Sequence, residues 1–185
     1  MIGGPLGFAL REAGPEDAEV LALIGAASFL DGFAGFIPGG AMVAHCAKAH
    51  SAEAYRAYFA KGARAFVGEA VHADALRGAP LGYALMCPPE LPQAAPGDIE
   101  LKRLYVLSRA HGGGLAQALF GAVAAAAREG GHQRLLLGTH PDNARAVGFY
   151  RKQGFATIGE RRFQVGERIF DDIVMALPLG ATPGC

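Results

Sequence analysis

The chain has 185 residues, of which 51% are hydrophobic and 18% are charged. This composition excludes an intrinsically disordered protein, and the length predicts one domain that buries a sizeable core. Lysine and arginine total 17, as do aspartate and glutamate, so no bulk positive charge points to nucleic acid or to an anionic membrane. We therefore expect neither of them as a partner.

The cysteines and the N-terminus bear on the cellular compartment. Cys46, Cys87 and Cys185 are widely separated, and neither they nor the histidines have the spacing of metal ligands. We therefore expect no metal and no disulfide framework. The N-terminus lacks a signal-peptide pattern, and the longest apolar run, residues 20–30, is far shorter than the ~20 residues that span a bilayer. These features predict a cytoplasmic protein.

The first third of the chain is predicted to contain one strand followed by helices. The strand covers residues 8–12, and Pro15 opens the helix after it. Phenylalanines alternate with glycines and a proline over residues 28–40, which predicts a helix end that runs into a mobile apolar loop. Residues 41–60 are predicted to be helical, with a break at Ser51 that caps the second piece.

The rest of the chain alternates between strands and helices. The predicted strands cover residues 63–69, 81–86, 99–107, 134–138, 155–163 and 168–177. Helices are predicted over 112–128 and 142–153, and glycines follow both of them. This order predicts one α/β domain over residues 1–179, a mixed sheet with helices on its faces, and a flexible tail over 180–185.

A glycine-rich turn is the most informative segment. Gly112, Gly113 and Gly114 separate a predicted strand from the next helix, with Arg109 and His111 beside them. The first amides of a helix lack partners and carry the positive end of its dipole, and glycines let a phosphate approach the backbone closely. This segment alone fits an anion site and fits equally an ordinary turn that binds nothing.

Two nucleotide-binding patterns fail at this turn. A P-loop needs lysine and then serine or threonine, where the chain has Leu115 and Ala116. The dinucleotide pattern G-x-G-x-x-G needs glycine or alanine where Gln117 stands. The acyl-CoA pattern Gln/Arg-x-x-Gly-x-Gly/Ala fits residues 109–114 completely.

A second segment follows the predicted strand at 134–138. Residues 143–155 read N-A-R-A-V-G-F-Y-R-K-Q-G-F, and residues 100–106 read E-L-K-R-L-Y-V. Together with the glycine turn, these segments resemble the GNAT superfamily of acyl-CoA-dependent N-acyltransferases, in the order that the family shows. The run from residue 159 to 175 is similar to the closing strands of the spermidine/spermine acetyltransferase-like branch.

The resemblance implies a fold and a CoA site. The GNAT fold has a central, splayed, mostly antiparallel sheet with helices on both faces, and acetyl-CoA is the co-substrate. The backbone of Leu104, Tyr105 and Val106 is expected to pair with the pantetheine arm like an added strand. The pyrophosphate is expected at a turn that comprises Arg109, His111, Gly112, Gly113, Gly114, Leu115, Ala116 and Gln117. The family often has arginine where His111 stands, so Arg109 is expected to compensate.

The resemblance also assigns roles on the helix over 142–153. Asn143 is expected to hydrogen-bond the CoA arm and also to cap the helix. Lys152 is either a CoA contact or a solvated helix charge. Tyr150 is expected to protonate the departing thiolate, and because Phe149 is its neighbour on the helix, the two are expected to point apart, one to the core and one to the cleft.

Acyl transfer to an amine needs a base, since a free alkylamine is mostly protonated at neutral pH. Glu100 is the candidate, and a structural salt bridge with Lys102 or Arg103 is the alternative. No G-x-S-x-G motif is present, so we expect direct attack in a ternary complex. Phe33 and Phe36 are core residues by type, with a lid over the acceptor pocket as the alternative.

The sequence therefore predicts an N-acetyltransferase that uses acetyl-CoA and a primary-amine acceptor. The acceptor is a small molecule or a peptide, and the branch resemblance slightly favours a polyamine-like amine. A homodimer is a common arrangement in such folds. Three alternatives stay open: a non-catalytic acyl-CoA-binding module, a nucleotide-dependent enzyme, and an interaction protein whose phenylalanine-rich loop is the interface.

Overall fold

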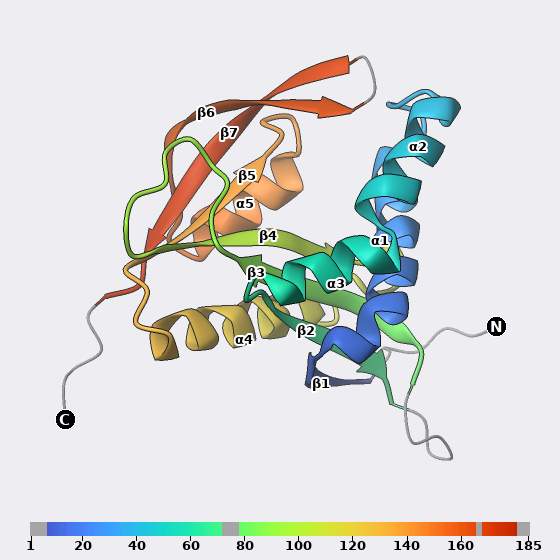
Figure 1. The fold of residues 1–185 in the computed structure, drawn as a ribbon, viewed down its shortest axis with the longest axis horizontal. Coiled ribbons are helices and arrows are strands. Elements are labelled where there is room, and N and C mark those ends of the chain that lie inside the picture. Colours follow the sequence, from blue (N-terminus) through green and yellow to red (C-terminus); the bar gives the residue numbers. More distant parts are fainter. Residues whose placement is uncertain (1–6, 72–77, 166–167, 181–185) are drawn as a thin grey trace.

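The computed structural model describes residues 7–71, 78–165 and 168–180, which form a seven-stranded sheet with the order β1-β2-β3-β4-β5-β7-β6 (Figure 1). The strands are β1 (Phe8–Ala13), β2 (Arg64–Ala70), β3 (Pro80–Cys87), β4 (Asp98–Val106), β5 (Arg134–Thr139), β6 (Ala156–Val165) and β7 (Arg168–Pro178). Within this sheet β4 and β5 pair in parallel and the other neighbours pair antiparallel. The predicted mixed sheet is confirmed. The flexible tail was predicted over residues 180–185, of which residues 181–185 lie outside the described residues.

Helices cover both faces of this sheet. They are α1 (Ala18–Phe33), α2 (Gly39–Ala49), α3 (Ala52–Ala60), α4 (Leu115–Glu129) and α5 (Ala144–Lys152), with short 3-10 turns at Pro15–Asp17 and Ser108–Ala110. On one face Leu119 and Val123 of α4 join the larger core cluster. On the other face Leu21 and Ile24 of α1 pack with Tyr55 of α3. In the described part of the chain, no helix has both the length and the apolar character to cross a membrane.

The segment over residues 28–40 differs from its prediction. Helix α1 continues to Phe33, so the connection to α2 is confined to residues 34–38. Phe29 is buried in a small cluster with Ile37 and Met42, and Phe33 packs against it. The predicted helix end and the apolar loop after it are therefore both present, but the loop occupies only residues 34–38, and Phe29 and Ile37 pack with Met42.

Two predicted caps are present. The side chain of Ser51 accepts a hydrogen bond from the amide of Ala54 at 3.1 Å, which separates α2 from α3 as expected. The side chain of Asn143 accepts one from the amide of Ala146 at 3.1 Å and begins α5. Both side chains satisfy an amide that the helix itself leaves without a partner.

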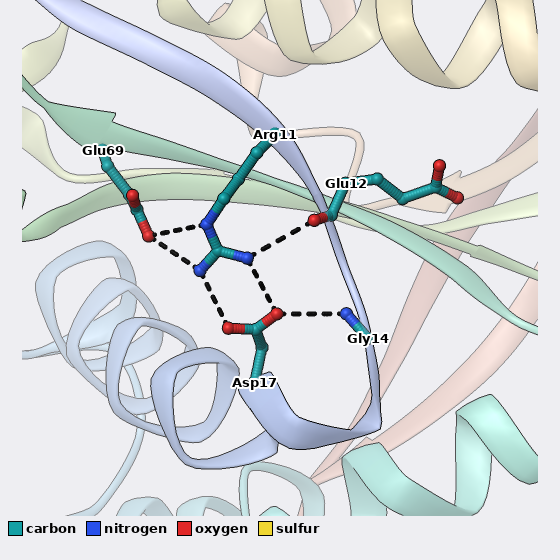
Figure 2. A network of polar contacts seen from close by, with 5 residues as sticks. All are labelled: Arg11, Glu12, Gly14, Asp17 and Glu69. Atoms are coloured by element: carbon teal, nitrogen blue, oxygen red, sulfur yellow. Dashed lines mark hydrogen bonds and ion pairs between the residues drawn. The ribbon is translucent and has the colours of Figure 1, made fainter. Parts of the chain in front are cut away.

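An ionic cluster fixes the first strand to the first helix (Figure 2). Both terminal nitrogens of Arg11 donate to the carboxylate of Asp17 at 2.8 Å, and Nε and Nη2 donate to Glu69 on the neighbouring strand at 3.0 and 2.7 Å. Asp17 also accepts from the amide of Gly14. Because Asp17 is buried, this bidentate pairing compensates a charge that would otherwise be costly.

Candidate active site

The strands β4 and β5 separate after a short parallel pairing. Only residues 98–100 of β4 pair with β5, at 134–136, although both strands continue, and Figure 1 shows them diverging from a shared start. The edge of β4 over residues 101–106 therefore has no strand partner on the β5 side within the described residues. An unpaired edge offers backbone donors and acceptors to an extended ligand.

An irregularity in β4 sets which side chains face which side. Met86 pairs with Leu101 and Leu85 pairs with Arg103, so Lys102 is an extra residue in β4. Such a bulge bends a strand and redirects its side chains. Leu101 and Leu104 both lie in or against the core under α4, whereas Tyr105 packs against the core under α1 and α3.

The glycine turn begins α4 three residues later than predicted. Gly112 and Gly114 have φ values of +79° and +84°, a left-handed backbone that favours glycine, and the helix starts at Leu115. The turn and the first helical residues therefore present amides at the positive end of the α4 dipole. This is the geometry of an anion site.

A cavity of about 290 Å³ joins this turn to the free edge of β4. Of the predicted site residues, it is lined by Leu104, Val106, His111, Gly112, Gly114, Leu115, Ala116, Gln117 and Tyr150. The predicted CoA-binding residues that do not line it are Tyr105, Arg109, Gly113, Asn143 and Lys152, and Glu100, Phe33 and Phe36 do not line it either. One cavity thus brings the end of β4 and the glycine turn together with α5, which follows about 30 residues later in the chain.

Arg145 of α5 also lines this cavity, and sequence reasoning missed it. Its guanidinium donates a hydrogen bond to Nδ1 of His111, and Nε2 of His111 donates to the carbonyl oxygen of Val106 at 2.9 Å. A cation from α5 therefore lies beside the turn at the position where His111 replaces the arginine that the resemblance leads one to expect. The one signal in the sequence was that Arg145 precedes Tyr150 in the same motif.

Tyr150 is buried at the α5 side of this cavity. Its ring packs against Phe155 and Phe149, with centroids 5.6 and 5.5 Å apart. Burial raises its pKa well above the usual range, and the nearby Tyr105 adds to this effect, so the hydroxyl keeps its proton at neutral pH. The expectation that Phe149 and Tyr150 point apart is wrong, because both line the cavity.

Glu100 lies inside the protein, with only 1% of its surface exposed. One carboxylate oxygen is 3.2 Å from Nζ of Lys102, and the other accepts a hydrogen bond from the amide of Glu90 at 2.8 Å. Lys102 also pairs with the Glu90 carboxylate at 2.7 Å. The predicted ion pair with Lys102 is therefore present, and Glu100 does not line the cavity at the glycine turn.

A second carboxylate, Asp172 of β7, is also buried and was not singled out from the sequence. Burial raises its pKa, whereas Arg161 and His140 act in the opposite direction. Nη2 of Arg161 donates to Asp172 at 3.3 Å.

A larger cavity of about 810 Å³ lies among α2, α3 and β4. Lys48, Lys61, Glu90 and Arg103 supply its charged groups, and alanines with His45 and Tyr58 supply the rest. Neither Phe33 nor Phe36 lines it, and Phe36 is 71% exposed. Among the described residues, no group of three metal-ligating side chains is close enough to hold an ion.

Comparison with known proteins gives related chains and folds. An uncharacterised N-acetyltransferase of Mycobacterium tuberculosis H37Rv is 38% identical over 99 residues, which are 54% of this chain and 60% of that protein, so the match spans less than two thirds of the curated relative. The PaiA N-acetyltransferase of Thermoplasma acidophilum, solved with coenzyme A, has a TM-score of 0.72 at 17% identity and covers 94% of this chain and 99% of its own.

A third similarity covers nearly all of both chains. The YncA acetyltransferase of Salmonella typhimurium, solved with acetyl-CoA, has a TM-score of 0.65 at 20% identity over 97% of this chain and 98% of its own. At such identities, these two solved proteins show the shared fold, which is the predicted one. The model of the acetyltransferase (GNAT) family matches residues 41–155, which include β4, the glycine turn and α5, and the chain therefore belongs to that family.

Proposed function

We propose that this chain is an N-acetyltransferase that transfers the acetyl group of acetyl-CoA to a primary amine by direct attack in a ternary complex. The observation that carries the proposal is the convergence of the free β4 edge, the glycine turn and Tyr150 on one cavity. The acceptor is the amine of a small molecule or a peptide.

The residues of this cavity fit the parts of acetyl-CoA. Leu104, Val106 and Leu115 offer an apolar wall to the pantetheine arm, and the backbone of residues 104–106 offers it hydrogen bonds. The amides from Gly112 to Gln117 suit the pyrophosphate. Four other predicted residues lie in the same turn or at α5 without lining the cavity: Arg109, Gly113, Asn143 and Lys152. We assign them to the outer phosphates of CoA and to the edge of the pantetheine arm.

Tyr150 supplies the proton for the departing sulfur. The amine nitrogen attacks the thioester carbonyl carbon, a C–N bond forms, the C–S bond breaks, and the CoA thiolate takes the proton of the Tyr150 hydroxyl. The raised pKa keeps Tyr150 protonated until that moment. Backbone amides on β4 are suited to stabilise negative charge on the carbonyl oxygen.

Two buried carboxylates are candidates for removing the amine proton. Glu100 is the first, reached through a water chain because Lys102 and the Glu90 amide cover it. Asp172 is the second, since burial raises its pKa and so makes its carboxylate a stronger base. Replacing each with its amide, Glu100→Gln and Asp172→Asn, separates them: loss of the true base removes the low-pH limb of the kcat/KM profile.

The first test measures ligand binding by thermal shift with acetyl-CoA, CoA, NAD and ATP. A ligand at ~100 times its Kd stabilises by ~2.7 kcal/mol, so only the two CoA species are expected to raise the Tm by several degrees. A response to NAD or ATP alone would overturn the proposal.

The second test is Tyr150→Phe in an assay of CoA release with a panel of amines. We expect kcat to fall about 10²-fold or more, the range of general acid catalysis, with an unchanged thermal shift by CoA. Val147→Ala, a buried change on the same helix, controls for packing. If CoA binds while no amine is acetylated, the chain is a non-catalytic acyl-CoA-binding module instead.

A further inference from the structure

The larger cavity lies on the opposite face of β4 from the CoA site. Leu104 and Val106 line the smaller cavity, whereas Arg103, the residue before them, lines the larger one. Successive residues of a strand point to opposite faces, so one stretch of β4 contributes to both cavities. An acceptor in the larger cavity would approach the strand that holds the thioester from its other face.

The charges on the larger cavity are mostly positive. Lys48 of α2, Lys61 after α3 and Arg103 of β4 line it, against one carboxylate, that of Glu90. Lys102 already pairs with Glu90 at 2.7 Å and thereby lowers the pKa of that carboxyl. Lys48, Lys61 and Arg103 therefore give the larger cavity a net positive charge.

Arg103 is a guanidinium without a counter-ion in the described residues. Its Nη2 donates to the backbone carbonyl oxygen of Ala49 at 2.7 Å, and it stacks on the rings of Tyr55 and Tyr58 at 4.9 and 5.3 Å from their centroids. Nη1 is shielded from solvent and has no hydrogen-bond partner among these residues. Cation–π contacts hold the guanidinium plane but leave its charge without an anion.

We propose that the larger cavity takes an acceptor amine that carries an anionic group, a carboxylate or a phosphate, held by Arg103, Lys48 and Lys61. This proposal rests on the acetyltransferase function and names its substrate class. It departs from a polyamine-like acceptor, because a polycation would be repelled by the positive charges of this cavity, whereas an anion would be attracted by Arg103, Lys48 and Lys61.

The test uses pairs of amines that differ in one charged group. The pairs are phosphoethanolamine with ethanolamine and glycylglycine with glycylglycine amide, and spermidine is the cationic probe. We expect kcat/KM for one anionic member to exceed that of its uncharged partner about 10-fold or more at low salt, with the advantage shrinking in 0.5 M NaCl. Which pair responds distinguishes phosphate from carboxylate.

Exposed lysines allow a test without risk to folding. Lys48→Gln combined with Lys61→Gln is expected to lower kcat/KM for the preferred anionic amine about 5- to 10-fold through KM, and that for its uncharged partner less than 2-fold. Arg56→Gln removes an exposed cation of α3 that does not line the cavity, and both values are expected to stay within 2-fold. Arg103→Gln is expected to lower kcat/KM for the anionic amine ~30-fold or more, and Arg103→Lys is expected to retain part of that activity.

Binding separates a failure of this proposal from a failure of the enzyme function. Calorimetry with CoA present measures phosphoethanolamine and glycylglycine against their uncharged partners, in wild type and in the double lysine variant. Charge-dependent binding without any acetyl transfer would support the anion site and overturn the proposed acetyltransferase function. Equal binding of the anionic amines and their uncharged partners would overturn the anion site and leave the enzyme function standing. The same conclusion would follow if spermidine were acetylated faster than the anionic amines and the double lysine variant did not change this rate.

Discussion

Gly25 of α1 lies against a buried chain of hydrogen bonds. Tyr55 bonds to Nδ1 of His50 at 2.9 Å and to the hydroxyl of Tyr83 at 2.6 Å. Burial and the positive charge of Arg103 lower the pKa of His50 to about 3, so its ring is neutral at pH 7. A side chain at Gly25 would collide with the Tyr55 hydroxyl and with the His50 ring. This cluster supports Tyr55, on which Arg103 stacks.

Gly25→Ala is therefore expected to destabilise the protein by about 1–3 kcal/mol, the usual cost of overpacking. Urea unfolding followed by circular dichroism measures it. Gly32→Ala in the same helix is the matched control, since a Cβ there meets nothing within 4 Å, and it should leave stability unchanged or raise it slightly. Equal effects of both changes would show that helix propensity, not the buried cluster, decides the outcome.

At the residue scale, the sequence predicted those residues whose chemistry is written in a local motif. Tyr150, His111 and the glycines belong to such motifs, and all of them meet at the smaller cavity except Gly113. Arg103 and Arg145 could not be predicted. The direction of Arg103 depends on the extra residue in β4, and the place of Arg145 depends on how α5 packs against the turn.

Helix α5 and the glycine turn together form the outer part of the proposed CoA site. Arg145 donates to His111, and the side-chain amides of Gln117 and Gln153 bond to each other at 3.0 and 2.8 Å. The helix thus brings a positive charge to a turn that otherwise offers backbone amides and His111. Phosphate binding at this turn is therefore expected to depend on α5.

Arg145→Gln is expected to weaken CoA binding about 5- to 10-fold, the worth of one charged contact to a phosphate at an exposed site. Calorimetric titration of CoA measures it, and dephospho-CoA shows which phosphate is involved. Arg151→Gln is the matched control, because Arg151 is exposed on the same helix but does not line the cavity. An unchanged Kd for Arg145→Gln would contradict the role of this residue.

At the element scale, helix and strand types were predictable and several ends were not. The glycines over residues 28–40 predicted a helix end within this segment, and α1 still includes Gly32, because a glycine near the end of a helix costs only about 1 kcal/mol. Burial of Phe29, Ile37 and Met42 contributes about 1.5–3 kcal/mol for each side chain and outweighs that cost. The start of α4 was displaced for a different reason, since Gly112 and Gly114 adopt left-handed conformations.

The divergence of β4 from β5 is a property of the whole sheet. Its two halves are joined by a pairing over three residues of β4, and β5 continues beside β7 while β4 continues beside β3. The sequence implied this splay only through family resemblance, because strand pairing is a long-range contact that no local pattern encodes. Strand β4, which contributes Arg103 to the larger cavity and Leu104 and Val106 to the smaller one, lies between the two cavities.

An ion pair fixes the point where the two halves meet. Nη2 and Nε of Arg134, the first residue of β5, donate to the carboxylate of Asp98, the first residue of β4, at 2.6 and 2.9 Å. Asp98 also accepts from the amide of Ala95 at 2.7 Å. The Arg134 hydrogen bond lowers the pKa of Asp98, burial opposes this, and the Ala95 amide adds to the lowering.

Asp98→Asn is expected to lower the free energy of unfolding by about 1–3 kcal/mol at pH 7, the worth of hydrogen bonds to a buried charge. Because the folded pKa lies below the unfolded value of ~3.9, this contribution is complete above about pH 5 and is lost as the pH falls through the folded pKa. Urea unfolding at pH 7, 5, 4 and 3 should therefore show a constant gap in the free energy of unfolding between wild type and Asp98→Asn down to pH 5. That gap should narrow below pH 4. Asp171→Asn, at a carboxylate that is 81% exposed, should show little gap at any pH. A gap for Asp98→Asn that persists unchanged at pH 3 would mean that its amide disturbs packing, and that the charge does not hold the two halves of the sheet together.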